Sequence, residues 1–170
     1  PAPGVIERPG GPHFLEFGEL EQPASARCTA IAQAITGAGM EAIVSPKIAE
    51  RMWWKLVGVC GASVFCIMRA NKGQVWDFAE TRTLMHQILT EGVAVARAHG
   101  IALAPTLPDD MVKIADTFPS QYKPSLLVDL EHGRRLEIEA WNGALVRYGK
   151  AAGVPTPVND VIYACLKPYA

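Results

Sequence analysis

Residues 45–69, SPKIAERMWWKLVGVCGASVFCIMR, decide the fold. The stretch opens with Ser45 and Pro46, a hydroxyl N-cap followed by proline in the first helical position, which is a favoured helix start. From Ile48 to about Arg69, apolar residues lie nearly all round the helix that this sequence would form. A helix without a polar face is buried on most sides. The stretch therefore predicts one long, largely buried helix over residues 48–69.

Downstream of this helix the sequence predicts further helices. Asp77 and Glu80 have capping-box spacing at the start of a helix over 77–99, which Gly100 ends. Glycine and proline delimit the remaining predicted helices, over residues 109–117, 125–132, 136–152 and 157–166. We therefore expect residues 46–170 to form an all-α domain of about five or six helices.

Residues 1–45 show a different pattern. Two extended segments on either side of a Pro/Gly turn predict a hairpin: residues 4–8 and 13–18 around 9–12. A helix is predicted over 24–37 and a short strand over 41–44. This strand–helix–strand order predicts the end of an α/β domain that begins upstream. Pro1, in place of methionine, indicates a processed, excised or truncated chain.

Composition and charge argue against several kinds of partner. Of the 170 residues, 49% are hydrophobic and the mean hydropathy is +0.12, which suffices for a core and is slightly high for a free monomer. A buried interface with a partner chain or a missing domain would account for the excess. The net charge of −1, without a run of Lys or Arg, predicts no nucleic-acid or membrane-surface partner. The longest apolar run, residues 56–68, is too short to span a bilayer.

The cysteines and histidines indicate neither a disulfide framework nor a metal site. The cysteines form no CxxC pair, and three of the four lie in apolar helical patterns: Cys28, Cys60, Cys66 and Cys165. Buried free thiols in a reducing cytoplasm are the expected state. The four histidines are scattered without zinc-site spacing, so we expect no metal.

Three polar residues are candidates for a functional site. Lys55 follows two tryptophans, and Lys55, Val59 and Ser63 share one face of the predicted helix. A lysine in apolar surroundings can donate a proton, although a lysine whose stem packs on the helix while its amine reaches water is commoner. Ser125 is at a predicted helix start, where a hydroxyl can bind a carboxylate or simply cap the helix. Glu137 is in a first helical turn, where the helix dipole alone explains a carboxylate.

Several short motifs also occur along the chain in a characteristic order. They are Trp53-x-Lys55-Leu56, Ser125-Leu126-Leu127-Val128-Asp129, Gly133-Arg134-x-x-Glu137-Ile138, Asn142-Gly143 and Gly153-Val154-Pro155-Thr156-Pro157, preceded by Gly18-Glu19 and Ala38-Gly39. Together they resemble the C-terminal domain of the ketopantoate reductase (2-dehydropantoate 2-reductase) family and the end of its nucleotide-binding domain. The resemblance implies a mainly α fold: a bundle like the C-terminal domain of 6-phosphogluconate dehydrogenase over 46–170, after a small α/β remnant of a Rossmann domain over 1–45.

The same resemblance implies an activity and its residues. The family reduces a 2-keto acid, 2-dehydropantoate, to the 2-hydroxy acid with NADPH, on the route to pantothenate and coenzyme A. Lys55 matches the family's catalytic lysine, and Ser125 matches a substrate-binding serine. Glu137 matches a glutamate that contacts the substrate; it is a second candidate catalytic residue, which could orient Lys55, and also a candidate cofactor contact. Ser63 and Asn71 are further candidates for substrate binding. A cytoplasmic enzyme, and a homodimer, are the corresponding expectations.

NADPH would be bound mainly by the nucleotide-binding half upstream of this chain. Gly37-Ala38-Gly39 does not begin a dinucleotide fingerprint, because it follows a helix and position 42 is alanine. The isolated chain is therefore expected to be inactive.

Two alternatives remain open. Val59 and Ser63 stand where the family commonly has asparagines, and a site that lacks a polar partner loses discrimination for a polar substrate. This departure favours a related reductase of another, less polar 2-keto acid. The other alternative is a non-catalytic helical module that dimerises or binds a partner through its apolar helices.

Overall fold

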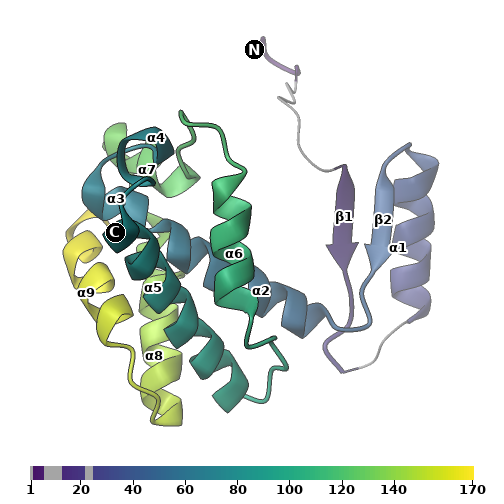
Figure 1. Ribbon diagram of the computed structural model, residues 1–170. Coiled ribbons are helices and arrows are strands. Elements are labelled where there is room, and N and C mark those ends of the chain that lie inside the picture. The colour runs from purple at the N-terminus through teal and green to yellow at the C-terminus, as the bar shows by residue number, and fades with distance from the viewer. Residues whose placement is uncertain (1, 6–12, 22–24) are drawn as a thin grey trace. The chain divides into compact units, whose positions relative to one another are not determined.

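The computed structural model describes residues 2–5, 13–21 and 25–170, and the chain divides into two compact units. The first unit covers Pro1–Ala49 and the second covers Glu50–Ala170. Figure 1 shows that the strands belong to the first and that the second is helical. The expected fold class, a small α/β part followed by a larger helical part, is confirmed.

The first unit is a strand–helix–strand element. β1 (Phe14–Phe17) pairs in parallel with β2 (Glu41–Val44), and α1 (Ala26–Gly37) connects them and contacts β2. Parallel neighbours need a crossover connection, which the helix provides. The predicted helix and second strand are confirmed. Of the predicted hairpin, residues 6–12 lie outside the described residues, and the 14–17 strand pairs with β2.

Gly18 and Glu19, which follow β1, contact residues after β2 and at the start of α1. A Cβ atom at Gly18 would clash with the Ser45 carbonyl oxygen, so a larger residue would force the backbone to move. Glu19 accepts hydrogen bonds from the Arg27 guanidinium and from the Ser25 hydroxyl, and these lower the pKa of its carboxyl to about 2. Ser25 in turn caps α1 by accepting a backbone N–H of its first turn.

The helical unit is built from short and medium helices (Figure 1). Its α-helices are α2 (Ile48–Ala62), α3 (Val64–Met68), α4 (Lys72–Val75), α5 (Ala79–Ala98), α6 (Leu107–Asp116), α7 (Ser125–Glu131), α8 (Asn142–Ala152) and α9 (Pro157–Leu166). Two 3-10 helices, η1 (Glu137–Glu139) and η2 (Lys167–Tyr169), complete it. Helices α5, α8 and α9 contact one another, and α6 packs along α5.

Glycines allow α2 to pack closely against α5. A Cβ atom at Gly61 would lie 2.7 Å from Leu89 Cδ2, and one at Gly92 would lie 3.0 Å from Val57 Cγ2. Val57 and Leu89 are both completely buried. Close packing of this kind maximises dispersion contacts in a core. The second half of α2 therefore lies in the core of its unit, while the first half is more exposed than its apolar sequence predicts, with Met52 59% exposed.

The predicted helix over 48–69 is divided at Ser63 into α2 and α3. The Ser63 hydroxyl and its backbone N–H both donate to the carbonyl oxygen of Cys60, which tightens the turn towards 3-10 geometry. Arg69 ends α3 in the left-handed conformation, with φ 48° and ψ 44°. The prediction of one continuous helix was therefore wrong at this serine, whose side chain competes for a backbone carbonyl.

Among the described residues, one helical stretch, Ile48–Met68, is long and apolar enough to cross a membrane by length and composition alone. Core helices of globular proteins meet the same criterion. Within this stretch Val57, Cys60 and Phe65 are at most 1% exposed. The middle and the end of this stretch therefore belong to the core of the helical unit.

The predicted helix over 136–152 is also divided. Between η1 and α8, Trp141 has φ −103° and ψ −102°, outside the helical region. The buried Asn142 amide donates to the Asn159 side chain on α9 at 2.9 Å, and Gly143 leaves room for the Tyr163 ring. Contacts with α9 thus accompany a break that the local sequence pattern does not reveal.

Two predicted helix starts also differ from the structure. The Asp77–Glu80 capping box is not formed, because α5 begins at Ala79 with Phe78 at the N-cap position. A capping box instead joins Asn71 and Gln74 at the start of α4. Helix α2 begins at Ile48 rather than at Pro46. In each case the local pattern identifies the helix but misplaces its first turn.

Candidate active site

A cavity of about 240 Å³ opens in the helical unit. Its walls come from α2, α3, α5, α6 and α7, together with residues 118–124 and Trp141. Apolar atoms form most of its surface, and Lys55, Tyr122 and Ser125 bring polar side chains to it. Segments far apart in the sequence therefore meet at one candidate site.

Helix α2 presents one face to the cavity. Lys55, Gly58, Val59 and Ala62 all line it, as the i, i+3 and i+4 spacing predicts. Lys55 is exposed, and its amine makes no hydrogen bond or ion pair with any other part of the chain that the structure describes. The amine can therefore bind the oxygen atoms of a ligand.

Ser63, which lies between α2 and α3, does not belong to this lining. It is completely buried, and its hydroxyl donates to the Cys60 carbonyl oxygen. The hydroxyl is therefore already used inside the helix, and among the described lining residues the cavity receives no polar group from this turn.

Ser125 reaches the same cavity from α7. It is the first residue of the helix, and Pro124 occupies the N-cap position with φ −65° and ψ 155°. The prediction of Ser125 as N-cap was wrong by one residue, because proline fixes the extended conformation that the cap needs. The structure brings the predicted pair Lys55 and Ser125 together.

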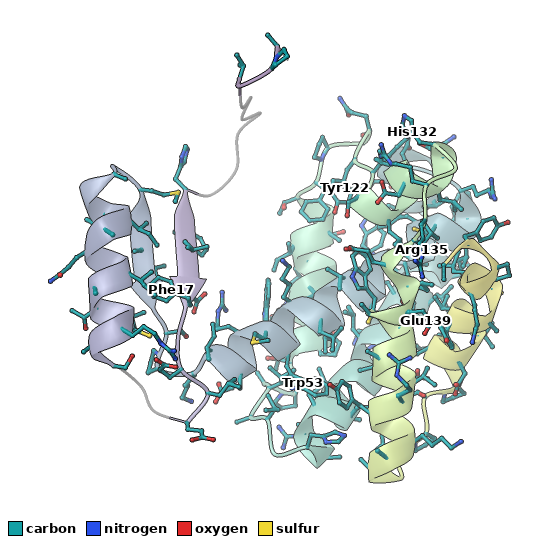
Figure 2. The ribbon with its side chains drawn as sticks, turned by 180° about the vertical axis from the view of Figure 1, so that it is seen from behind. Phe17, Trp53, Tyr122, His132, Arg135 and Glu139 are labelled. Atoms are coloured by element: carbon teal, nitrogen blue, oxygen red, sulfur yellow. The ribbon has the colours of Figure 1, made fainter. Side chains whose placement is uncertain are left out.

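The structure places Glu137 and Asn71 differently. Glu137 begins η1, a single 3-10 turn rather than the predicted α-helix, and it is exposed without lining the cavity. Its neighbour Glu139, labelled in Figure 2, accepts a hydrogen bond from the Tyr163 hydroxyl at 2.7 Å. Asn71 caps α4 by accepting from the Gln74 N–H. Neither Glu137 nor Asn71 converges with Lys55 within this cavity.

Apart from Trp54, which directly precedes Lys55, the sequence pattern does not predict the aromatic residues of the cavity. Tyr122 (Figure 2) lies between α6 and α7, and its ring centroid is 4.2 Å from that of Phe118 and 6.2 Å from that of Phe65. Burial raises the pKa of the Tyr122 hydroxyl. Trp54 and Trp141 complete the aromatic lining. Aromatic residues shortly before Ser125 are a signal in the sequence, but the path of the loop decides where they point.

A set of hydrogen bonds from α4 fixes the segment that carries Tyr122. The Lys72 amine donates to the carbonyl oxygens of Asp116, at 2.7 Å, and Phe118. The Lys72 N–H donates to the Tyr122 carbonyl oxygen at 3.1 Å, and the Gly73 N–H to that of Ser120 at 2.6 Å. We call these bonds the α4 clamp. They hold residues 116–122 on one side, while Phe118 and Tyr122 line the cavity.

The Asp116 carboxylate extends this clamp to α5. It accepts hydrogen bonds from the Arg82 guanidinium and, at 2.7 Å, from the Trp76 indole N–H. These two donors lower the pKa of the Asp116 carboxyl to about 2. The end of α6 is therefore fixed by charge-assisted hydrogen bonds, which are stronger than neutral ones.

The cavity suits a small organic anion with an apolar portion. An ammonium and a hydroxyl can bind carboxylate or carbonyl oxygens, and apolar walls exclude the water that would weaken these interactions. A positioned ammonium also stabilises negative charge that develops on a carbonyl oxygen and can donate a proton to it.

Comparisons with known proteins show the family of the chain and its fold. The family model described as the C-terminal domain of ketopantoate reductase PanE/ApbA matches residues 47–170. A 2-dehydropantoate 2-reductase from Mesorhizobium japonicum is 30% identical over 175 residues, which cover 98% of this chain and 50% of the relative. The chain thus spans about half the length of the curated relatives that it matches.

Solved structures show the same fold. A PanE/ApbA family ketopantoate reductase from Ralstonia eutropha JMP134 matches with a TM-score of 0.82 at 28% identity, covering 94% of this chain and 52% of that one. A dimeric ketopantoate reductase from Staphylococcus aureus matches with a TM-score of 0.85, covering 92% and 53%; its identity of 24% supports a shared fold alone.

Proposed function

Since this chain belongs to the ketopantoate reductase family, we propose that it is the substrate-binding half of an enzyme that reduces a 2-keto acid to a 2-hydroxy acid. The observation that carries the proposal is the presence of Lys55 and Ser125 in one apolar cavity. Both residues match the family's functional motifs, and the cavity has the chemistry that a keto acid requires. 2-Dehydropantoate or a related compound is the proposed substrate, and pantothenate and coenzyme A synthesis the proposed pathway.

In the proposed mechanism, Ser125 and Lys55 have separate roles. The Ser125 hydroxyl donates a hydrogen bond to the substrate carboxylate and fixes its orientation. The Lys55 ammonium donates to the keto oxygen, stabilises the negative charge that develops there during reduction, and delivers the proton that completes the hydroxyl group. The apolar walls keep water away, so that both interactions act in a medium of low polarity.

The proposed hydride donor is NADPH. Among the described residues, Gly39 follows α1 with φ +83°, and no strand precedes it in the way that a dinucleotide loop requires. The described residues therefore do not fit a complete dinucleotide site, and we assign NADPH mainly to the nucleotide-binding half of the longer protein. When bound, the dinucleotide supplies the hydride. The isolated chain should not turn over substrate.

Glu137 keeps a proposed role outside the cavity. It is exposed at the start of η1. Trp141, which follows it by four residues in the sequence, lines the cavity. We assign it to a substrate or cofactor group that projects beyond these walls. Ser63 and Asn71 receive no substrate contact in this proposal, because intramolecular hydrogen bonds already use their side chains.

The proposal extends to assembly and location. A homodimer is proposed, since the Staphylococcus aureus neighbour is described as dimeric. The cysteines are free thiols, which fits the proposed cytoplasmic location.

The test is Lys55→Ala in the polypeptide that joins this chain to its nucleotide-binding half. We expect kcat for the 2-keto acid to fall by about 10²–10⁴-fold, which is the usual size of general acid catalysis. Lys113→Ala, at a lysine on α6 that is 75% exposed, is the matched control and should leave kcat unchanged. Near-normal turnover of Lys55→Ala would contradict the assignment of Lys55. If the protein binds no 2-keto acid, the result would favour the alternative that the chain is a non-catalytic helical module.

A further inference from the structure

The cavity combines two polar groups with extended apolar walls. Lys55 contributes an amine and Ser125 a hydroxyl. These groups suit the carboxylate and keto oxygens that all 2-keto acids share. The remaining walls therefore contact the substrate's side chain, which is the part that differs between 2-keto acids.

The walls from α2 and α6 present apolar side chains. Beyond Lys55, the lining residues of these two helices are Trp54, Gly58, Val59, Ala62, Met111, Ile114 and Ala115, and of these only Trp54 carries a polar group, its indole N–H. The nearby Ser63 hydroxyl is bonded to the Cys60 carbonyl oxygen and does not line this cavity. A substrate hydroxyl against these walls would lose its water without gaining a partner, which costs free energy.

Tyr122 and the indole N–H groups of Trp54 and Trp141 could oppose this effect, since all three residues line the cavity. The Tyr122 hydroxyl can both donate to and accept from a polar substrate group, whereas an indole N–H can only donate. The Tyr122 ring, however, packs against Phe118 and Phe65 and adds an aromatic face to the apolar walls. Tyr122→Phe separates these two contributions, because it removes the hydroxyl and keeps the ring.

The volume of the cavity indicates how large a substrate side chain it can accept. An apolar cavity of about 150 Å³ in another protein admits a benzene molecule. The cavity here is about 240 Å³. It can therefore accept a side chain of phenyl size together with part of the keto acid group.

We propose that the preferred substrate is a 2-keto acid with a bulky apolar side chain, branched or aromatic, that carries no hydroxyl group. The proposal rests on the proposed function, because it assigns this cavity to the substrate. Val59 is the specificity-determining residue, since it occupies the turn of α2 that follows Lys55 and presents only methyl groups.

The test compares two substrates that differ in one group. They are 2-dehydropantoate and 3,3-dimethyl-2-oxopentanoate, in which a methyl group replaces the hydroxyl. Calorimetric titration of this chain measures both dissociation constants without any nucleotide. We expect the methyl compound to bind about 10-fold more tightly, since one apolar group in an apolar pocket changes affinity by about this factor.

Two variants locate the preference. Val59→Thr keeps the shape and adds a hydroxyl, so the preference for the methyl compound should shrink several-fold. Val161→Thr is the matched control, because Val161 is 62% exposed on α9 and does not line the cavity, and it should retain the wild-type preference. Tyr122→Phe should also retain it if the ring alone matters.

The outcomes separate this inference from the proposed function. If both keto acids bind but 2-dehydropantoate binds equally well or better, the inference is wrong and the proposed function stands. A preference that Val59→Thr leaves unchanged also overturns the assignment to Val59, and a preference that grows in Tyr122→Phe shows that the tyrosine hydroxyl pairs with the substrate hydroxyl. If neither compound binds, or if Lys55→Ala and Ser125→Ala do not weaken binding, the proposed function itself fails.

Discussion

Lys55 on α2 and Ser125 at the first residue of α7 line the same cavity, although the whole of α3 to α6 separates them in the sequence. Each side chain alone has an ordinary structural explanation. Together, against apolar walls, they are the two side chains that we propose bind the oxygen-bearing groups of a 2-keto acid.

Ser125→Ala should weaken substrate binding without slowing the chemical step. The hydroxyl is proposed to bind the carboxylate equally in the ground state and the transition state, and removing such an interaction raises KM while kcat stays nearly constant. We expect KM to rise by roughly 10-fold or more, since hydrogen bonds to charged groups contribute about 1.5–3 kcal/mol. Steady-state kinetics of the complete reductase measure this effect. Ser125→Thr keeps the hydroxyl, so its KM should be close to that of the wild type. An unchanged KM in Ser125→Ala would contradict the proposed role of Ser125 in binding the carboxylate.

Lys72→Met should disturb the cavity from outside. The variant removes the amine that binds the Asp116 and Phe118 carbonyl oxygens and so loosens the segment that carries Tyr122. As a positioning residue, Lys72 should affect KM for the keto acid several-fold and kcat much less. The change in unfolding free energy should be about 1–2 kcal/mol, measured by urea denaturation.

Lys113→Met is the control for this clamp, because Lys113 is an exposed lysine on α6 whose amine lies 3.7 Å from Asp110. It should change neither KM nor stability. If Lys72→Met lowered stability but left KM at the wild-type value, the α4 clamp would be structural only.

Asp116→Asn should make the stability of the protein depend less on pH in the acid range. The Arg82 and Trp76 donors lower the pKa of this carboxyl from its ordinary value of 3.8 to about 2. Between these values the unfolded chain binds more protons than the folded one, so stability rises with pH. The contribution is complete above about pH 4 and is lost as the pH falls towards about 2. Tm measured across this range should fall less steeply in the variant than in the wild type.

The matched control is Asp110→Asn, at a half-exposed carboxylate on the same helix. It should reproduce the wild-type pH profile. Since the Asp116 side chain is 41% exposed, solvent screening keeps the effect moderate. Parallel acid profiles for the wild type and Asp116→Asn would show that these hydrogen bonds do not contribute.

Glu91→Gln should destabilise the contact between α5 and α9. The Glu91 carboxylate accepts from the N–H groups of Val158 and Asn159, at 2.8 and 2.9 Å, and thereby caps α9 from another helix. It also accepts from the Asn159 amide at 2.7 Å. A glutamine can accept through one oxygen only, so about 1–3 kcal/mol of unfolding free energy should be lost. Glu80→Gln, an exposed site on the same helix, should cost little, and equal effects of the two substitutions would contradict the capping role.

The local sequence pattern predicted most of the helices but not their breaks. Apolar periodicity identified α5, and proline or glycine delimited α6, α7 and α9. It missed the divisions at Ser63 and Trp141. At Ser63 the hydroxyl competes for a backbone carbonyl, and near Trp141 the polar contact of Asn142 with α9 accompanies the break. Neither interaction changes the hydrophobic period, so a pattern of apolar residues cannot detect it.

The sequence by itself determined which residues share a helix face, and therefore that Lys55 and Val59 lie together on α2. It also indicated the family. Each of the short motifs is unspecific by itself, but their order along the chain is characteristic. Only the tertiary structure decided that Ser125 joins Lys55, that Ser63 and Glu137 stay outside the cavity, and that Tyr122 enters it. The reason is physical: helical periodicity fixes directions within one element. The meeting of distant side chains depends instead on how helices pack and on hydrogen bonds such as the α4 clamp, which act between segments far apart in the chain.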